Sequence, residues 1–173
     1  MKNQLPKAFL IIFCLLSMVV FSQRATVKFS GVVTDNGQPV AGVLVYVIDA
    51  GARKSEMYTD STGKFEVETF FNKMIYIHFV KEGYVHLSNW ANTRIRNMQQ
   101  SNMEMGFNFS LIKQPLDGRV LTSKGPIEKI KFNYDKGKFR IDTVYHAKVQ
   151  PKIKSFLALV AAKKETAKTD SIN

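Results

Sequence analysis

Residues 26–112 consist of short strand-like runs separated by turn signals about every ten residues, and several of the runs alternate between apolar and polar side chains with a period of two. A period of two places every second side chain on the same face of a β-strand. Short strands at this spacing are typical of an all-β sandwich or barrel. The alternation is longest in five odd-numbered apolar positions, Met103, Met105, Phe107, Phe109 and Leu111.

Four other segments have the composition of strands. Residues 27–33 and 64–68 alternate in character and are predicted to have one face in the core. Residues 43–48 and 74–80 are continuously apolar and are predicted to be inner strands. The polar segment 88–102, which contains the only tryptophan, is predicted to be a long loop or irregular edge.

Residues 113–165 are predicted to form a small hairpin and an amphipathic helix. The hairpin joins residues 130–134 to residues 139–141 through Asp-Lys-Gly. Pro151 is suited to the first position of the helix, and apolar residues follow it at helical spacing. Residues 166–173 are predicted to be a disordered tail.

Residues 1–22 have the pattern of a secretory signal peptide. Lys2 and Lys7 give a basic start, and an apolar run covers residues 8–21. The run is too short to span a bilayer comfortably, so cleavage is predicted to leave Gln23 as the mature N-terminus. The alternative is an uncleaved anchor, which lacks the expected charge cluster directly after the run. We therefore expect an exported protein.

Cys14 is the only cysteine and lies within that apolar run. It lacks the small residues that usually precede a lipidated cysteine, so a lipoprotein is not expected. Cleavage would leave no thiol, and therefore no disulfide, cysteine metal site or thiol nucleophile. A mature chain of about 150 residues is long enough to bury an apolar core without such links.

The chain is strongly basic. Its formal net charge is +11, and removal of Lys2 and Lys7 lowers this charge to +9. An exported basic protein meets anionic lipid headgroups, acidic glycans and acidic proteins. Nucleic acid is not expected as a partner, because no recognition module is present and the basic residues are spread along the chain.

Three segments resemble signatures of the carboxypeptidase-regulatory-like family. Residues 31–43 turn through Asp-Asn-Gly-Gln-Pro into Gly-Val, residues 59–65 turn at a glycine before an aromatic residue, and residues 81–84 read Lys-Glu-Gly-Tyr. Their order and spacing match the family over about residues 28–87. The resemblance implies a seven-stranded, transthyretin-like Greek-key sandwich over residues 26–112, which accompanies enzymes or receptors without performing their chemistry.

The later residues resemble the tail of standalone exported Bacteroidetes proteins that carry this sandwich. The similarity rests on residues 103–111, on residues 125–134 and on Phe139. It implies a relation to outer-membrane uptake, gliding or secretion machinery. Because the sequence ends at Asn173 without a plug or barrel, the chain is not expected to be a transporter itself.

No metal site is predicted. His78 and His86 lie eight residues apart on predicted strands, and His146 lies in the C-terminal part, so the three are interpreted as polar groups at a surface. Four turn residues offer oxygen atoms to Ca²⁺, but their spacing is that of ordinary turns. These residues are Asp35, Asn36, Asp60 and Ser61.

No catalytic residue and no cofactor are predicted either. The sequence shows no nucleophile with a base and no pair of carboxylates placed for a cleft. Glu66 and Glu68 lie two residues apart on a predicted solvated strand face. The chain is therefore expected not to be an enzyme.

The leading hypothesis is a non-catalytic exported binding or assembly module of the bacterial cell envelope. It would act as an adaptor for an outer-membrane or periplasmic complex, with the helix docked on the sandwich or on a partner protein. The alternatives for the helix are contact with an anionic membrane surface and folding only on contact. The candidate helix residues are Phe156, Leu157, Val160, Lys152 and Lys163.

The alternative function is a glycan or small-ligand binding module. Aromatic rings on a sheet surface provide planes on which such ligands stack. The candidate ligand surface consists of Trp90, Tyr76, Tyr84 and Asn92.

Overall fold

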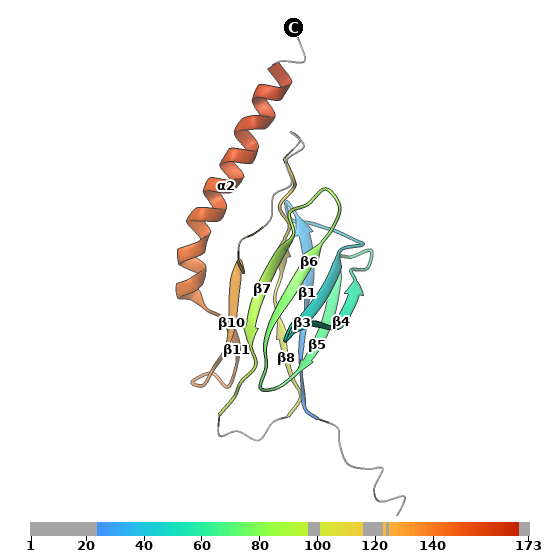
Figure 1. Ribbon diagram of the computed structural model, residues 1–173, viewed down its shortest axis with the longest axis vertical. Coiled ribbons are helices and arrows are strands. Elements are labelled where there is room, and N and C mark those ends of the chain that lie inside the picture. Colours follow the sequence, from blue (N-terminus) through green and yellow to red (C-terminus); the bar gives the residue numbers. More distant parts are fainter. Residues whose placement is uncertain (1–23, 97–100, 116–122, 124, 170–173) are drawn as a thin grey trace, which may run out of the picture.

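The computed structural model describes residues 24–96, 101–115, 123 and 125–169, so the predicted signal peptide lies outside the described residues. In the described part, eleven strands form two sheets, and a long helix follows them (Figure 1). The predicted all-β sandwich with a C-terminal hairpin and helix is confirmed. No helix in this part of the chain is both long and apolar enough to cross a membrane.

The first sheet is built around β1 (Thr26–Asp35). This strand pairs antiparallel with β5 (Lys64–Phe70) and, at its C-terminal end, with β2 (Gln38–Pro39). It also pairs in parallel with β8 (Met103–Gly106) and β9 (Phe109–Ser110). Two segments about 75 residues apart in the sequence therefore run side by side in this sheet.

The second sheet has six strands in the order β4, β3, β6, β7, β10 and β11. Strands β7 and β10 are parallel, and the other neighbours are antiparallel. The predicted C-terminal hairpin is β10 and β11, and it extends this sheet. The strand bounds are β3 (Leu44–Asp49), β4 (Ala52–Tyr58), β6 (Met74–Val80), β7 (Leu87–Asn92), β10 (Glu128–Asn133) and β11 (Lys138–Ile141).

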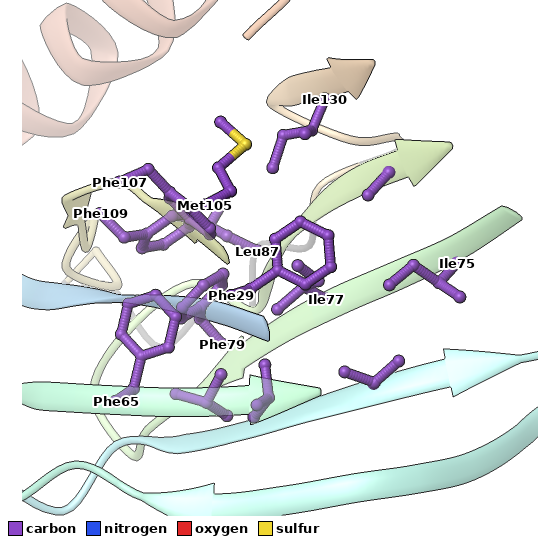
Figure 2. Packing of buried hydrophobic residues seen from close by; sticks show 14 of the residues in the cluster. Phe29, Phe65, Ile75, Ile77, Phe79, Leu87, Met105, Phe107, Phe109 and Ile130 are labelled. Atoms are coloured by element: carbon purple, nitrogen blue, oxygen red, sulfur yellow. The ribbon is translucent and has the colours of Figure 1, made fainter. Parts of the chain in front are cut away.

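The core lies between the two sheets and is rich in phenylalanine (Figure 2). The rings of Phe79 and Phe109 stack with their centroids 3.7 Å apart, and Phe65 meets Phe79 edge to face at 5.4 Å. Phe65 and Phe109 come from β5 and β9 of the first sheet, and Phe79 comes from β6 of the second. This cluster of rings therefore joins the two sheets. Large buried rings of this kind dominate the energetics of a core.

Gly31 allows β1 and the chain between β8 and β9 to approach each other closely. A Cβ atom at this position would lie 1.7 Å from the carbonyl oxygen of Phe107. The backbone N–H of Phe107 donates to the carbonyl of Ser30 at 2.9 Å, which fixes the contact. Only glycine leaves room for backbone at this distance.

The three signature segments meet at one end of the sandwich. Tyr84 donates from its hydroxyl to Asp35 Oδ2 at 3.0 Å, and Lys113 forms an ion pair with the same oxygen at 2.9 Å. The Lys113 ammonium, more than the Tyr84 hydroxyl, holds the pKa of Asp35 below its ordinary value. Gly63 has φ +72° and accepts the N–H of Val33, so the second signature closes on the first.

The strand prediction was wrong for residues 88–92. These residues belong to β7, and Trp90 lies on a strand instead of a loop. The polar Asn89 is fully buried and donates to Glu128, so a core position of this strand carries an amide. A polar residue at a core position hides the alternation from a reading of the sequence.

Residues 103–111 also differ in one respect from the prediction. They form β8 and β9 with a break at residues 107–108, and the odd-numbered residues still face the core. The predicted register is therefore confirmed. Strand β4 was not predicted, because it is an exposed edge strand with charged residues.

The helix α2 (Thr143–Thr169) begins eight residues before the predicted start at Pro151. Asp142 caps it, since its Oδ1 accepts the N–H of Tyr145 at 3.1 Å. Pro151 lies inside the helix. The helix also continues through residues 166–169 of the predicted disordered tail, where alanine and lysine favour helix.

The packing predicts a large difference between neighbouring positions of the chain between β8 and β9. Phe107→Ala is expected to lower the free energy of unfolding by about 3–5 kcal/mol, because it removes a buried ring from contact with Phe65. Asn108→Ala is the control; it removes only the hydrogen bond from Val32 N–H and is expected to cost about 1 kcal/mol. Urea unfolding of both variants tests this prediction, and equal losses would contradict it.

Candidate functional site

The outer face of the second sheet carries a group of aromatic side chains. Odd-numbered residues of β3, β6 and β7 point into the core, so the even-numbered residues point outward. Tyr76 is 41% exposed and lies directly across from Trp90 on the neighbouring strand. We call the four outward-facing rings of this region the aromatic face: Tyr46, Tyr76, His78 and Trp90.

One half of the aromatic face is a stack of rings. Tyr46 and His78 are partners across β3 and β6, and their rings stack at 4.9 Å with an angle of 14°. The guanidinium of Arg53 lies 4.0 Å from the centre of the Tyr46 ring. Arg53 is also paired with Glu56 at 2.6 Å, so its charge is partly compensated. The guanidinium and two rings thus form a layered arrangement that fixes the orientation of Tyr46.

His78 and His86 form a pair beside this stack. Nδ1 of His78 lies 2.9 Å from Nε2 of His86, a hydrogen-bond distance in which one nitrogen donates and the other accepts. Burial, followed by the nearby His86 and Arg53, lowers the pKa of His78 to about 4. Burial also lowers the pKa of His86. Both rings are therefore neutral at pH 7 and contribute polar planes to the face without charge.

The other half of the aromatic face combines rings with a cation. Lys129 lies across from Trp90 in the parallel pair β7–β10, and its Nζ is 5.5 Å from the centre of the Trp90 ring. The same Nζ is 4.4 Å from the centre of the Tyr145 ring. An ammonium group near two ring faces is attracted by both quadrupoles. Lys129 is thereby held at the border of the face.

The start of α2 holds Tyr145 in this position. The Tyr145 hydroxyl donates to the carbonyl of Pro126 at 2.7 Å, and burial followed by the nearby Tyr76 raises its pKa. The capping residue Asp142 uses its other oxygen for an ion pair with Lys131 at 2.7 Å. The Lys131 partner holds the pKa of Asp142 below its ordinary value. The helix start is thus tied to the same sheet face.

A second polar group lies on the inner side of β10. Burial raises the pKa of Glu128, whose Oε2 accepts from Asn89 Nδ2 at 3.2 Å. Its Oε1 lies 3.4 Å from Nδ1 of His146 on α2. No donor among the described residues reaches Asn89 Oδ1. These three side chains join the helix to the sheet edge, so His146 is a structural contact.

The predicted ligand surface is largely assembled. Tyr76 and Trp90 are neighbours on the outer face, and Asn92 lies on the same face, one position further along β7. Tyr84 is not part of this surface, because it is bound to Asp35 at the end of the sandwich. This placement corrects the inclusion of Tyr84, whose hydroxyl has a structural role.

The predicted helix contacts can be placed only in part. Lys152 is exposed and borders a hollow of about 390 Å³ between α2 and the sandwich. Ile153 packs against the core. The remaining candidates lie in α2, but their side chains lie outside those that the structure describes; they are Phe156, Leu157, Val160 and Lys163.

Several members of the site were not predicted from the sequence. Tyr46 lies within an apolar run, and Lys129 and Tyr145 lie more than 35 residues from Trp90 along the chain. Their shared position depends on the pairing of β7 with β10 and of β3 with β6. The only sign of these residues in the sequence is that an aromatic or basic side chain alternates with buried apolar side chains along the strands.

Two other regions of the surface contain polar groups that are already paired within the protein. A hollow of about 870 Å³ lies at the end of the first sheet, and Lys73 and Asp49 in its lining form an ion pair at 2.9 Å. Asp60 is a turn residue, since its Oδ1 accepts the N–H groups of Thr62 and Lys64. Within the described residues, no cluster of three or more His, Cys, Asp or Glu side chains is placed to hold a metal ion.

The chain matches no family model, and no curated protein matches it. It is similar to the solved structure of catechol 1,2-dioxygenase from Pseudomonas arvilla C-1, with 14% identity and a TM-score of 0.43 over 62% of this chain and 59% of that one. For 3-chlorocatechol 1,2-dioxygenase from Rhodococcus opacus 1CP the identity is 17% and the TM-score 0.42, over 55% and 62% of the two chains. For the dioxygenase domain of a dioxygenase carbohydrate-binding protein fusion from Streptomyces sp. SirexAA-E the values are 18% and 0.41, over 56% and 86%.

These comparisons correct one prediction. The chain was expected not to be an enzyme, whereas the three similar structures are of dioxygenases. That expectation is therefore withdrawn. Dioxygenase activity is not assigned either, because identities of 14–18% with TM-scores of 0.41–0.43 carry no information about chemistry. The chain spans only about 60% of the length of the first two of these proteins, the dioxygenases from Pseudomonas arvilla C-1 and Rhodococcus opacus 1CP.

The histidine pair predicts a pH dependence of stability. The pKa of His78 is about 4 in the folded protein and 6.5 ordinarily, so the unfolded chain binds the proton more tightly. The stabilisation is complete above about pH 6.5 and is lost as the pH falls toward 4. Urea unfolding between pH 7.5 and 4.5 is expected to show this loss, and His78→Gln should reduce it. A variant with the same pH dependence as the original protein would refute the assignment.

Proposed function

We propose that the chain is a binding module of the bacterial cell envelope that holds a glycan or small ligand against the aromatic face. The observation that carries the proposal is the cross-strand pair of Tyr76 and Trp90 on a solvent-facing sheet surface. Sugar rings and other flat ligands gain contact area on such rings at little entropic cost, because the rings are held by the strands. Asn92 adds an amide nitrogen that can donate beside the rings, while its Oδ1 accepts the N–H of Arg94 at 3.0 Å.

The location in the envelope is also part of the proposal. It is supported by the basic start and apolar run of residues 1–22 and by the net charge of the chain. The three segments that resemble carboxypeptidase-regulatory-like signatures have a structural role here, since they contribute turns, a buried ring and an ion-paired aspartate. None of the four rings of the aromatic face belongs to these segments, so the resemblance does not determine which ligand the face binds.

The proposal predicts the effect of Trp90→Ala. Retention on an immobilised polysaccharide, measured by affinity electrophoresis, is expected to fall by about tenfold or more, because the stacking plane is lost. Phe70→Ala is the matched control: Phe70 is 49% exposed but lies on the first sheet, so its removal should leave retention unchanged. Circular dichroism of both variants checks folding. Equal retention of the original protein and the folded Trp90→Ala variant would refute the proposal.

A second candidate function is an adaptor that binds an envelope protein or complex through α2. The 27 residues of this helix span about 40 Å at 1.5 Å per residue. Its C-terminal half extends beyond the strands in Figure 1, while its first half is attached to the sandwich through Tyr145 and Ile153. A helix held at one end and projecting at the other is suited to bind a groove on a partner.

The adaptor candidate predicts the behaviour of a double substitution. Phe156→Asp together with Val160→Asp is expected to reduce co-purification of an envelope partner severalfold, because apolar helix contacts tolerate charge poorly. The sandwich should stay folded, since its core comes from the strands. Circular dichroism and pull-down under mild detergent measure both properties. A double variant that unfolds throughout, or that retains its partner, would contradict the adaptor role.

A further inference from the structure

The aromatic face has a cationic border on one side. Lys129 and Lys131 lie on the outer face of β10, and the register of β11 places Arg140 opposite Lys131 and Lys138 opposite Asn133. Side chains that oppose each other in an antiparallel pair share a face of the sheet. We call Lys129, Lys131, Lys138 and Arg140 the cationic border. It continues the surface that begins at Tyr76 and Trp90.

Most of the positive charge of this border is not neutralised within the protein. Among the described residues, Asp142 is the only carboxylate within ion-pair distance of the four cations, and it pairs with Lys131. Glu128 is next to Lys129 in the sequence, but its side chain is on the opposite side of β10 and contacts Asn89 and His146 instead. Three of the four cations therefore have no acidic partner in this part of the chain.

Lys129 links the two surfaces. Its Nζ lies 5.5 Å from the centre of the Trp90 ring and 4.4 Å from the centre of the Tyr145 ring, so a ligand that contacts Trp90 lies close to the ammonium. The side chain is only partly exposed, and its orientation is limited by the two rings. A neutral ligand on Trp90 would cover this ammonium without offering it a counter-charge, whereas a carboxylate would form a charge-assisted hydrogen bond.

We infer that the ligand of the aromatic face is an acidic polysaccharide, whose sugar rings stack on Tyr76 and Trp90 and whose carboxylates bind Lys129 and the rest of the cationic border. This inference rests on the proposed function and specifies its ligand class. A chain of uronic acids matches the surface, because it alternates apolar ring faces with carboxylates at short intervals. Single-stranded nucleic acid also combines planes with charge, but an exported protein is not expected to meet it.

The test compares two polymers with the same backbone. Polygalacturonate carries carboxylates, and its fully methyl-esterified form does not. Calorimetric titration of the purified protein is expected to show binding to polygalacturonate that is about tenfold tighter than binding to the ester and that weakens with added salt. Equal affinity for the two polymers would overturn the inference.

Variants at Lys129 locate the effect. Lys129→Met keeps an unbranched apolar stem beside Trp90 and should weaken binding of polygalacturonate by about tenfold while leaving the ester unaffected. Lys129→Arg should restore most of the affinity. Lys64→Met removes the same charge from an exposed position on the first sheet and should have little effect. A loss of equal size in Lys64→Met would mean that only net charge matters, and would overturn the inference.

The outcomes separate this inference from the proposed function. If Trp90→Ala abolishes binding of both polymers while Lys129→Met changes neither, the face binds glycans without selecting acids, and only the inference fails. If Trp90→Ala binds both polymers as the original protein does, the proposed function fails as well. Tighter binding of a single-stranded oligothymidylate than of polygalacturonate would assign the surface to nucleic acid and overturn the inference.

Discussion

The alternation along β6 connects the core of this protein to its proposed binding face. Ile75, Ile77 and Phe79 are fully buried, while Tyr76 and His78 between them point to solvent. Because the strand is central, with β3 and β7 on its two sides, its register fixes both neighbours. A slip of one residue would expose the buried set and bury a tyrosine and a histidine, and the apolar exposure alone, about 1.5–3 kcal/mol per side chain, is of the order of the stability of a whole domain.

Within each sheet, contacts join distant parts of the sequence. Gly31 admits the carbonyl of Phe107, and the parallel pairing of β7 with β10 brings Lys129 to Trp90. Both contacts require that the sandwich is already largely formed, because parallel neighbours cannot be joined by a tight turn. The position of Lys129 beside Trp90 is thus a product of tertiary structure, and so is the Tyr46–His78 stack, because β4 and β5 separate its two strands in the sequence.

The sequence was sufficient to predict the fold class, the hairpin β10–β11 and the burial of the odd-numbered residues around Phe107. These features have a strong period or a specific turn. It was not sufficient for β7, where the buried Asn89 interrupts the apolar pattern, or for α2, where Asp142 rather than Pro151 marks the start. Of the site, Tyr76, Trp90 and Asn92 were predicted from residue type. Tyr145 was not predicted, because its position depends on the helix cap at Asp142, about 50 residues after Trp90 in the sequence.

The distribution of charge on the second sheet gives the face two distinct regions. The centre is neutral at pH 7, because burial lowers the pKa of both His78 and His86 and because Glu56 compensates Arg53. The border is positive, since only Lys131 among its cations has an acidic partner in the described part of the chain. A ligand that lies across both regions must therefore present an apolar surface toward Tyr76 and a negative charge toward Lys129. This polarity defines one direction of approach, because a ligand turned end to end would place its charge against neutral rings and leave the ammonium covered and unpaired.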